Sequence, residues 1–461
     1  MVTTRRQSAL EEDKGASTRA RVRASPSKAT PAPKKTKKEK KTQEKHQHEY
    51  EFFGPNLGPL GIVLGLPAVM YGLYGSCGSH GCVSLAPFHI PNFKLSHTVV
   101  SLEGFLVYLG WILAVALLHI CLPSSVKPGV KLANGECLKY RMNGLLVYIV
   151  VLASLAVAYF GHKLPILLYV YDHFVELITA SVVTTLLFSG VLYLASFRSK
   201  TVLCAKGGNT GSRFYDFFIG RELNPRIGNF DLKEFCELYP GLIGWVVIDL
   251  AMACRQYEDQ GYVTNSMALV CLFHAIYVAD ALYFEKAILT TMDIVHDGFG
   301  FMLVFGDLAW VPFTYTVQAR YLVDHPKQLP NYFAATVFLL QTFGYLAFRG
   351  ANSQKDLFRR DPNSPKVKHV KYINTKRGTK LMVSGWWGIA RHINYTADWL
   401  MGLSWCLCCG FDHLIPYFYA IYFGILLIHR DLRDGEACEH KYGTDWKKYC
   451  AIVKYRLVPS I

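Results

Sequence analysis

The chain has 461 residues, of which 51% are hydrophobic and 14% aromatic, and its formal net charge is +15. The mean hydropathy of +0.19 is too high for an ordinary soluble protein, even though the first fifty residues are strongly polar. These values exclude a typical soluble enzyme and predict a membrane protein with a polar N-terminal tail.

The N-terminal tail, residues 1–49, is rich in Lys, Arg, Ser, Thr, Pro and Ala and shows no apolar periodicity. Such a segment buries too little apolar surface to fold, so we expect it to be disordered. Its basic stretches RARVRASPSK and PKKTKKEKK could bind nucleic acid, chromatin or anionic lipid. Alternatively, the tail only keeps the N-terminus in the cytosol.

Largely uncharged stretches follow the tail, and many are long enough to cross roughly 30 Å of hydrocarbon. We therefore expect an all-α, polytopic membrane protein with about ten transmembrane helices. The expected spans are residues 57–76, 104–121, 142–161, 177–197, 239–254, 263–283, 299–319, 331–348, 398–409 and 412–429. Lys and Arg concentrate before the first span and after the second, fourth and eighth, which predicts that both termini face the cytosol.

Metal and disulfide chemistry leave few traces in the sequence. The histidines are scattered, without HxxxH or HExxH boxes, so the sequence favours no metal site. Most cysteines lie in apolar stretches, where a small hydrophobic residue is the simpler interpretation. Cys77 and Cys82, in CGSHGC, would lie on the lumenal side and could form a short-loop disulfide.

Ionisable residues inside the expected spans are candidates for function, because each costs free energy unless it is paired or faces a cavity. His274, Tyr277 and Asp280 follow one another at intervals of three and therefore share a helix face. Pairing between helices would explain any single one of them equally well. More polar residues follow, which together predict a polar pocket beneath the cytosolic face: Tyr283, Glu285, Asp293, Asp297 and Asp307.

Basic and aromatic residues gather after the eighth expected span. Lys355 and Arg359 lie four residues apart, which places them on one helical face suited to cofactor phosphates. The segments SGWWGIARHINYTADW and HRDLRDGEACEHKYGTDWKKYC add Arg, aromatic and amide groups that can hold phosphates, adenine and a carboxamide. The stretch GFGFMLVFG imitates a dinucleotide-binding loop but lacks the strand-turn-helix context, so a Rossmann fold is not expected.

Two of these segments carry a family resemblance. LMVSGWWGIARHINYTADW and YDFFIGRELNPRIG resemble the two signatures of the sterol carbon–carbon double-bond reductases, and the resemblance covers residues 50–461. Within the family, DLKEFCELYPGLIGWVVIDLAM and neighbouring segments look most like the delta(14)-sterol reductases. The sterol reductase domain of the lamin B receptor belongs to the same subgroup.

The resemblance implies a ten-helix membrane domain, residues 50–461, with an NADPH pocket that faces the cytosol in the half from about residue 320 to 461. Met382 stands where the family usually has Leu. The cofactor contacts implied by the resemblance are Lys355, Arg359, Met382, Trp387, Asn394, Tyr395, Asp434, Cys438, Tyr442 and Tyr449. Arg391 and His392 would brace the cofactor residues, while Asp398 would either anchor that bracing or pair with Arg391.

The implied reaction reduces the C14=C15 bond of an 8,14-diene sterol in sterol biosynthesis. A proton delivered to carbon 15 generates a carbocation at carbon 14, which hydride from NADPH then quenches. We expect Tyr283 to be the proton donor, backed by Asp280 or Glu285, with Asp297 and Asp307 as alternatives.

The predicted function is therefore an NADPH-dependent sterol reductase of the endoplasmic reticulum membrane. Its expected partners are a sterol, membrane lipid and other enzymes of the sterol pathway. Three alternatives stay open: a nuclear-envelope tether with a chromatin-binding tail, a sister reductase acting on the C7 double bond, and, from the RHINY motif, a prenylcysteine methyltransferase.

Overall fold

The computed structural model describes residues 50, 52, 54–79, 81–85, 88–89, 98–132, 135–199 and 202–458. The expected disordered tail, residues 1–49, lies outside the described residues. In this part of the chain the helices are α1 (Leu57–Gly75), α2 (Leu102–Cys121), α3 (Gly144–Ala156), α4 (Ile166–Asp172), α5 (Phe174–Ala195), α6 (Arg213–Ile219), α7 (Leu232–Leu238), α8 (Pro240–Gln260), α9 (Asn265–Tyr283), α10 (Met292–Val295), α11 (Phe301–Phe305), α12 (Val311–Thr314), α13 (Val317–Asp324), α14 (Asn331–Arg360), α15 (Trp386–Ile389), α16 (Ile393–Leu407), α17 (Phe418–Tyr442) and α18 (Thr444–Ile452).

The all-α prediction missed short antiparallel strand pairs in the connecting segments. They pair as β1 (Cys77–Gly78) with β2 (Gly81–Cys82), β3 (Ser84–Leu85) with β4 (Phe88–His89), β5 (Ser125–Lys131) with β6 (Cys137–Met142), β7 (Arg226–Ile227) with β8 (Phe230–Asp231), and β9 (Tyr372–Asn374) with β10 (Lys380–Met382). These pairs are too short and too polar to give an alternating apolar pattern that sequence reading detects.

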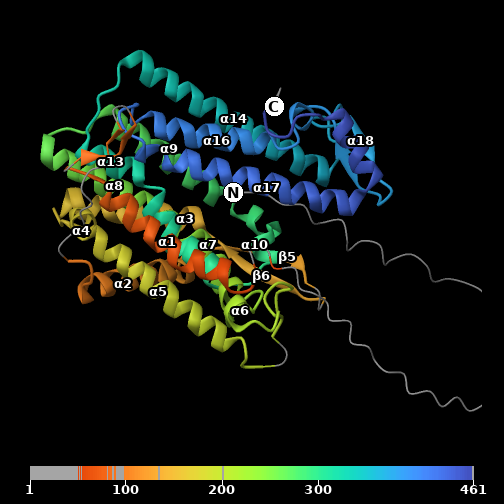
Figure 1. Ribbon diagram of the computed structural model, residues 1–461, viewed down its shortest axis with the longest axis horizontal. Coiled ribbons are helices and arrows are strands. Elements are labelled where there is room, and N and C mark those ends of the chain that lie inside the picture. Colours follow the sequence, from red (N-terminus) through yellow and green to blue (C-terminus); the bar gives the residue numbers. More distant parts are fainter. Residues whose placement is uncertain are drawn as a thin grey trace, which may run out of the picture.

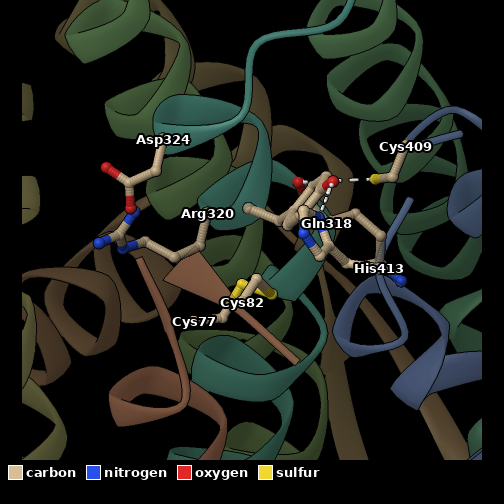
Figure 2. Close-up of a disulfide and its surroundings, with 8 residues drawn as sticks. Cys77, Cys82, Gln318, Arg320, Asp324, Cys409 and His413 are labelled. Carbon is tan, nitrogen blue, oxygen red and sulfur yellow. Dashed lines mark hydrogen bonds and ion pairs between the residues drawn. A yellow bond between two sulfur atoms is a disulfide. The ribbon is translucent and has the colours of Figure 1, made fainter. Parts of the chain in front are cut away.

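The helices form an elongated bundle in which α14, α16 and α17 run side by side along the long axis (Figure 1). At one end these three helices extend beyond the others and meet α18, and β5 and β6 lie at the same end (Figure 1). We call this the α18 end. The helix α13 lies at the opposite end (Figure 1), and Cys77 and Cys82 lie beside it (Figure 2), so we call this the disulfide end.

Six helical segments in the described part of the chain are long and apolar enough to cross a membrane. They are Leu57–Gly75, Leu102–Cys121, Gly144–Gly161, Phe174–Ala195, Leu232–Gln260 and Asn265–Tyr283. The four later expected spans also coincide with helical chain, but residues 301–324 are broken by a π-helical turn, Gly306–Trp310, and the others extend into polar sequence. On α2, Leu106, Leu113 and Leu117 are more than half exposed, as expected of side chains that face lipid.

The protein core surrounds α8. Asp231 caps the preceding α7 by accepting a 2.9 Å hydrogen bond from the Glu234 amide, and Pro240 stands at the start of α8, where its missing N–H costs nothing. Ile243 and Trp245 of α8 are fully buried. Since α8 packs against α4, α9, α12 and α13, it fixes the position of α9 within the bundle.

A disulfide joins Cys77 and Cys82 across the β1–β2 pair, which confirms the sequence expectation. Both half-cystines are buried. Figure 2 shows the bond beneath α13, with the 2.6 Å ion pair of Arg320 and Asp324 on one side. The disulfide therefore closes the turn that follows α1, and this turn packs on α13.

A close backbone contact explains part of the YDFFIGRELNPRIG signature. Gly220 has φ +96°, and a Cβ built on Gly298 would lie only 1.7 Å from the Gly220 carbonyl oxygen. Nearby, the Phe299 amide donates a 3.0 Å hydrogen bond to the Glu222 carbonyl. Because any side chain would collide with main chain here, the contact requires glycine at both positions.

Glu285, one of the predicted acid–base residues, lies in a buried hydrogen-bond network just beyond the end of α9. Its Oε2 accepts hydrogen bonds from the Gly144 amide at 2.9 Å and the Tyr239 hydroxyl at 3.1 Å. Burial raises the pKa of Glu285 to about 7, and these two hydrogen bonds offset part of the effect. Glu285 thus anchors the N-terminus of α3 to the segment after α9.

This raised pKa predicts a pH-dependent stability. The usual pKa of 4.5 applies in the unfolded chain, so the contribution of Glu285 to stability is fully present below about pH 4.5 and is lost as the pH rises through about 7. Glu285→Gln keeps a neutral acceptor and should escape this loss, which is up to roughly 3 kcal/mol. Melting curves of both proteins in detergent from pH 4.5 to 8 should diverge, with the variant relatively more stable at high pH; parallel curves would contradict the assignment.

Candidate functional site

The first group of predicted cofactor residues packs on the last turns of α14. Trp387, from the short helix α15, is buried and donates a 2.9 Å hydrogen bond from Nε1 to the Ala351 carbonyl. The Lys355 ammonium lies 4.1 Å from the centre of a Trp387 ring, a cation–π contact. Arg359 follows one turn later on α14 and lines a cavity. The predicted shared face of Lys355 and Arg359 therefore agrees with the helix observed.

The second group lies at the start of α16, against α17. The Tyr395 hydroxyl donates a 3.0 Å hydrogen bond to Asp434 Oδ2, so two predicted cofactor residues contact each other. The His392 ring stacks on Tyr395 and its Nε2 lies 3.3 Å from Asp431, which also binds Arg456. His392 therefore contacts one predicted cofactor residue, and its bracing role stays a prediction.

Asn394, beside Tyr395 on α16, is 2% exposed. Its side-chain oxygen is buried and has no hydrogen-bond partner among the described residues. An unsatisfied buried amide oxygen is costly, so such a group in a native protein indicates a missing ligand or water. Asn394 is thus ready to accept a hydrogen bond from an amide N–H of a bound molecule.

The remaining predicted cofactor residues lie in two apolar clusters near the α18 end. Met382 of β10 packs with Trp387, Phe358 and two valines. Cys438 and Tyr449 are buried in a second cluster, and Tyr442 packs against that cluster. The structure thus gathers all ten predicted cofactor residues on α14, α16, α17, α18 and the chain between α14 and α16.

A cavity of about 940 Å³ opens beside this group at the α18 end. Arg359 and Tyr442 line it, together with segments from the part of the chain before residue 320. No Asp or Glu lines it in the part of the chain that is described. Its cationic lining residues are Lys131, Lys206, Lys286, Arg359, Arg360, Lys380 and Lys441. Such a cavity attracts a polyanion.

A smaller cavity of about 370 Å³ lies between α16 and α17. Tyr395 and Trp399 contribute to it from α16, and isoleucine, leucine, alanine and glycine residues of α17 form most of the rest. It is therefore suited to an apolar molecule. Tyr395 lines this apolar cavity and its hydroxyl also binds Asp434, so this residue belongs both to the apolar cavity and to the polar group of predicted cofactor residues.

The predicted polar face of α9 contacts three different helices. His274 Nδ1 lies 2.8 Å from Asp249 of α8, and both side chains are fully buried. One turn later the Tyr277 hydroxyl donates a 3.2 Å hydrogen bond to Asp398 of α16. Asp280 accepts from Tyr345 and pairs with Arg349 of α14 at 2.8 Å.

The expected pairing of Tyr283 with Asp280 or Glu285 is wrong. Tyr283 is 68% exposed and its ring packs on Phe284, whereas the two carboxylates bind the partners described above. Each interval of three residues falls about 60° short of a full helical turn, so by residue 283 the series has rotated about 180° from His274 and the Tyr283 side chain is exposed. The suggested pairing of Asp398 with Arg391 is not found among the described residues either, since Asp398 binds Tyr277.

The other acidic candidates belong to the chain after α9. The fully buried Lys233 ammonium donates to the carbonyls of Asp293 at 2.5 Å and Asp297 at 2.8 Å, which fixes this turn. The Asp297 carboxylate binds His296 at 2.9 Å. In the described part of the chain Asp307 Oδ2 is buried without a hydrogen-bond partner. These residues therefore form a polar network in the chain after α9, and the carboxylates of Asp293 and Asp297 also lie near enough to Arg430 of α17 to interact with its charge.

Tyr277 is not among the predicted proton donors, although its spacing from His274 and Asp280 indicated the shared face. Its ring centre lies 5.2 Å from that of Trp405 and 6.0 Å from that of Trp245. Asn394 and Asp398 lie four residues apart on α16 and so share one face of that helix. A hydroxyl that can release a proton and an amide that can hold a carboxamide are therefore about one helical turn apart.

Comparisons with known proteins show which family the chain belongs to. Residues 46–461 match the model of the ergosterol biosynthesis ERG4/ERG24 family. The chain is 47% identical to the delta(14)-sterol reductase erg24 of Schizosaccharomyces pombe, over 89% of this chain and 96% of that protein. It is 45% identical to the mouse delta(14)-sterol reductase TM7SF2, over 89% and 97%.

The delta(14)-sterol reductase LBR of Gallus gallus is also 45% identical, over 87% of this chain but only 63% of that protein. The family match and these relatives cover nearly all of the chain beyond its tail, including every candidate site residue. The chain therefore belongs to the ERG4/ERG24 family of ergosterol biosynthesis.

Proposed function

We propose that this protein is an NADPH-dependent delta(14)-sterol reductase that reduces the C14=C15 bond of 8,14-diene sterols. The observation that carries the proposal is the placement of Tyr277, Asp398 and Asn394 around one face of α16. Sequence identity of 40–47% to delta(14)-sterol reductases supports the same reaction type.

The residues of the C-terminal half suit a phosphorylated dinucleotide. In our proposal Asn394 accepts a hydrogen bond from the carboxamide, because its buried oxygen otherwise has no partner among the described residues. Lys355 and Arg359 hold phosphates, and the aromatic and apolar side chains around Tyr442 and Met382 enclose the adenosine. When bound, NADPH supplies the hydride that ends the reaction.

Tyr277 replaces Tyr283 as the proposed proton donor. A conjugated diene without an electron-withdrawing group is a poor hydride acceptor, so the proton must come first, and the Tyr277 hydroxyl delivers it to carbon 15. The Asp398 carboxyl group, 3.2 Å from the hydroxyl, returns a proton to the phenol oxygen when it is itself protonated, and it then takes up a new proton from solvent. The carbocation then lies at carbon 14, where it is both tertiary and allylic, until hydride arrives.

Aromatic rings around Tyr277 would stabilise this cation without offering it water. Trp245 and Trp405 pack at 5.6 Å, and Trp405 also packs on Tyr419 at 5.0 Å. The faces of aromatic rings attract cations. An apolar wall also excludes water, which would otherwise add to the carbocation and give an alcohol. The apolar cavity between α16 and α17 is our proposed place of entry for the sterol from lipid.

We further propose that residues 50–461 form ten membrane-spanning helices, with the α18 end and both termini in the cytosol. The six apolar helical segments and the cationic cavity at the α18 end support this orientation. The disulfide at the opposite end then lies in the oxidising lumen of the endoplasmic reticulum, where disulfides persist. A nuclear-envelope role through the basic tail, residues 1–49, is the second candidate, and other sterol enzymes remain candidate partners.

Sterol analysis of cells tests the proposed reaction. Loss of the protein should cause 8,14-dienols to accumulate, and expression of the chain should remove them. A form without residues 1–49 should do so equally well if the tail is only topogenic. Accumulation of 5,7-dienols would instead assign the C7 double bond, and failure of a well-expressed tailless form would favour a tether. Preferential binding of S-adenosylmethionine over NADPH would favour a methyltransferase.

A further inference from the structure

The part of the chain before residue 320 contributes one wall of the cationic cavity. Lys131 ends β5, Lys206 lies in the chain between α5 and α6, and Lys286 lies in the 3-10 helix after α9. All three lysines are exposed. The sequence predicts cofactor contacts only beyond about residue 320, so these lysines fall outside every predicted contact. They nevertheless line the same cavity as Arg359 and Tyr442.

The three lysines make no ion pair with a carboxylate of the described residues. No ion pair is found for Lys131, Lys206 or Lys286 within the described ranges, and no carboxylate of these ranges lines the cavity. By contrast, Arg360 at the same cavity pairs with Asp356 at 2.5 Å. Like charges around one concave space repel one another, so a bound polyanion would relieve the repulsion as well as gain attraction.

The direction of α14 indicates which anion reaches the lysines. Arg359 lines the cavity, Lys355 lies one turn before it on α14, and Asn394 at the start of α16 does not line the cavity. A dinucleotide with its carboxamide at Asn394 therefore runs past Lys355 with its diphosphate and reaches the cavity with its adenosine end. The only further charge at that end is a phosphate on the adenosine ribose.

We propose that Lys131, Lys206 and Lys286 form the subsite for the 2′-phosphate and thereby select NADPH over NADH. This inference rests on the proposed function. In this arrangement the cofactor bridges two parts of the chain: the part after about residue 320 holds the diphosphate, and the part before it recognises the additional phosphate. A lysine ammonium is a compact charge at the end of a flexible side chain. Three of them suit a phosphate dianion that is recognised by its charge and not by bidentate hydrogen bonding.

Binding of the two dinucleotides tests the proposal on the full chain in detergent. The triple variant Lys131→Gln, Lys206→Gln and Lys286→Gln should weaken NADPH binding at least tenfold and change NADH binding by less than threefold, measured by dinucleotide fluorescence. A matched variant removes the same charge from exposed lysines outside the cavity: Lys139→Gln, Lys366→Gln and Lys368→Gln. It should bind both dinucleotides as the unmodified protein does. Melting curves confirm that both variants fold.

The outcomes separate this inference from the proposed function. If the unmodified protein binds NADPH but the cavity variant binds it equally well, the phosphate subsite is wrong and the reductase proposal stands. Equal weakening of NADPH and NADH would overturn the selective role, because the lysines would then act on the diphosphate. If the unmodified protein binds neither dinucleotide, the proposed function itself fails.

Discussion

Replacement of Tyr277 by Phe is expected to lower the turnover of an 8,14-diene sterol at least ~10²-fold while NADPH affinity changes by less than threefold. The substitution removes one oxygen, the one that lies 3.2 Å from Asp398, and preserves the ring that packs on Trp405. Turnover in detergent with saturating NADPH and sterol measures the effect, and dinucleotide fluorescence measures the affinity.

Tyr283→Phe provides the matched control, because Tyr283 is 68% exposed and lies on the same helix. It should leave turnover unchanged. Asp398→Asn should resemble Tyr277→Phe, since the amide cannot restore the proton. If Tyr283→Phe abolishes turnover and Tyr277→Phe does not, the donor proposed here is wrong and the exposed end of α9 must contact the sterol.

A second large effect is expected from Gly298→Ala, which should destabilise the fold by at least ~3 kcal/mol and sharply reduce the yield of folded protein. The new methyl group would lie 1.7 Å from the Gly220 carbonyl oxygen, and main chain on both sides prevents relaxation. Thermal stability in detergent and monodispersity by size-exclusion chromatography measure the loss.

Gly110→Ala is the appropriate comparison, because a Cβ at Gly110 of α2 meets no atom within 4 Å. This variant should be as stable as the unmodified protein or slightly more so, since alanine favours helix. A Gly298→Ala protein with unchanged melting behaviour would show that the segments around Gly220 and Gly298 are not packed as the structure describes.

The membrane helices were accessible from sequence because long uncharged runs are a direct consequence of hydrocarbon thickness. The helix boundaries after residue 299 were harder to predict from the sequence. Gly306 begins a π-helical turn that carries Asp307, and α14 continues as far as Arg360 although its apolar part is shorter. Hydropathy reports where a chain is apolar, whereas hydrogen bonding along the helix decides where it ends.

The candidate site could be predicted only in part from the sequence, because local spacing does not show which distant segments pack together. Local spacing sufficed for Lys355 and Arg359, which share one helix. The hydrogen bond between Tyr277 and Asp398 joins residues 121 positions apart and depends on how α9 packs against α16. Lys131 and Lys206 could not be assigned to the cavity at all, because nothing near them in sequence indicates that the first half of the chain reaches α14.

The fate of isotopic label in the sterol tests the central claim most directly. The purified protein, an 8,14-diene sterol and NADPH carrying deuterium at the transferred position should give a product with deuterium at carbon 14 and a solvent-derived hydrogen at carbon 15. Turnover in deuterated water with unlabelled NADPH should reverse the two positions. Deuterium from the cofactor at carbon 15, or reduction of a 5,7-diene in preference to the 8,14-diene, would contradict the proposed reaction.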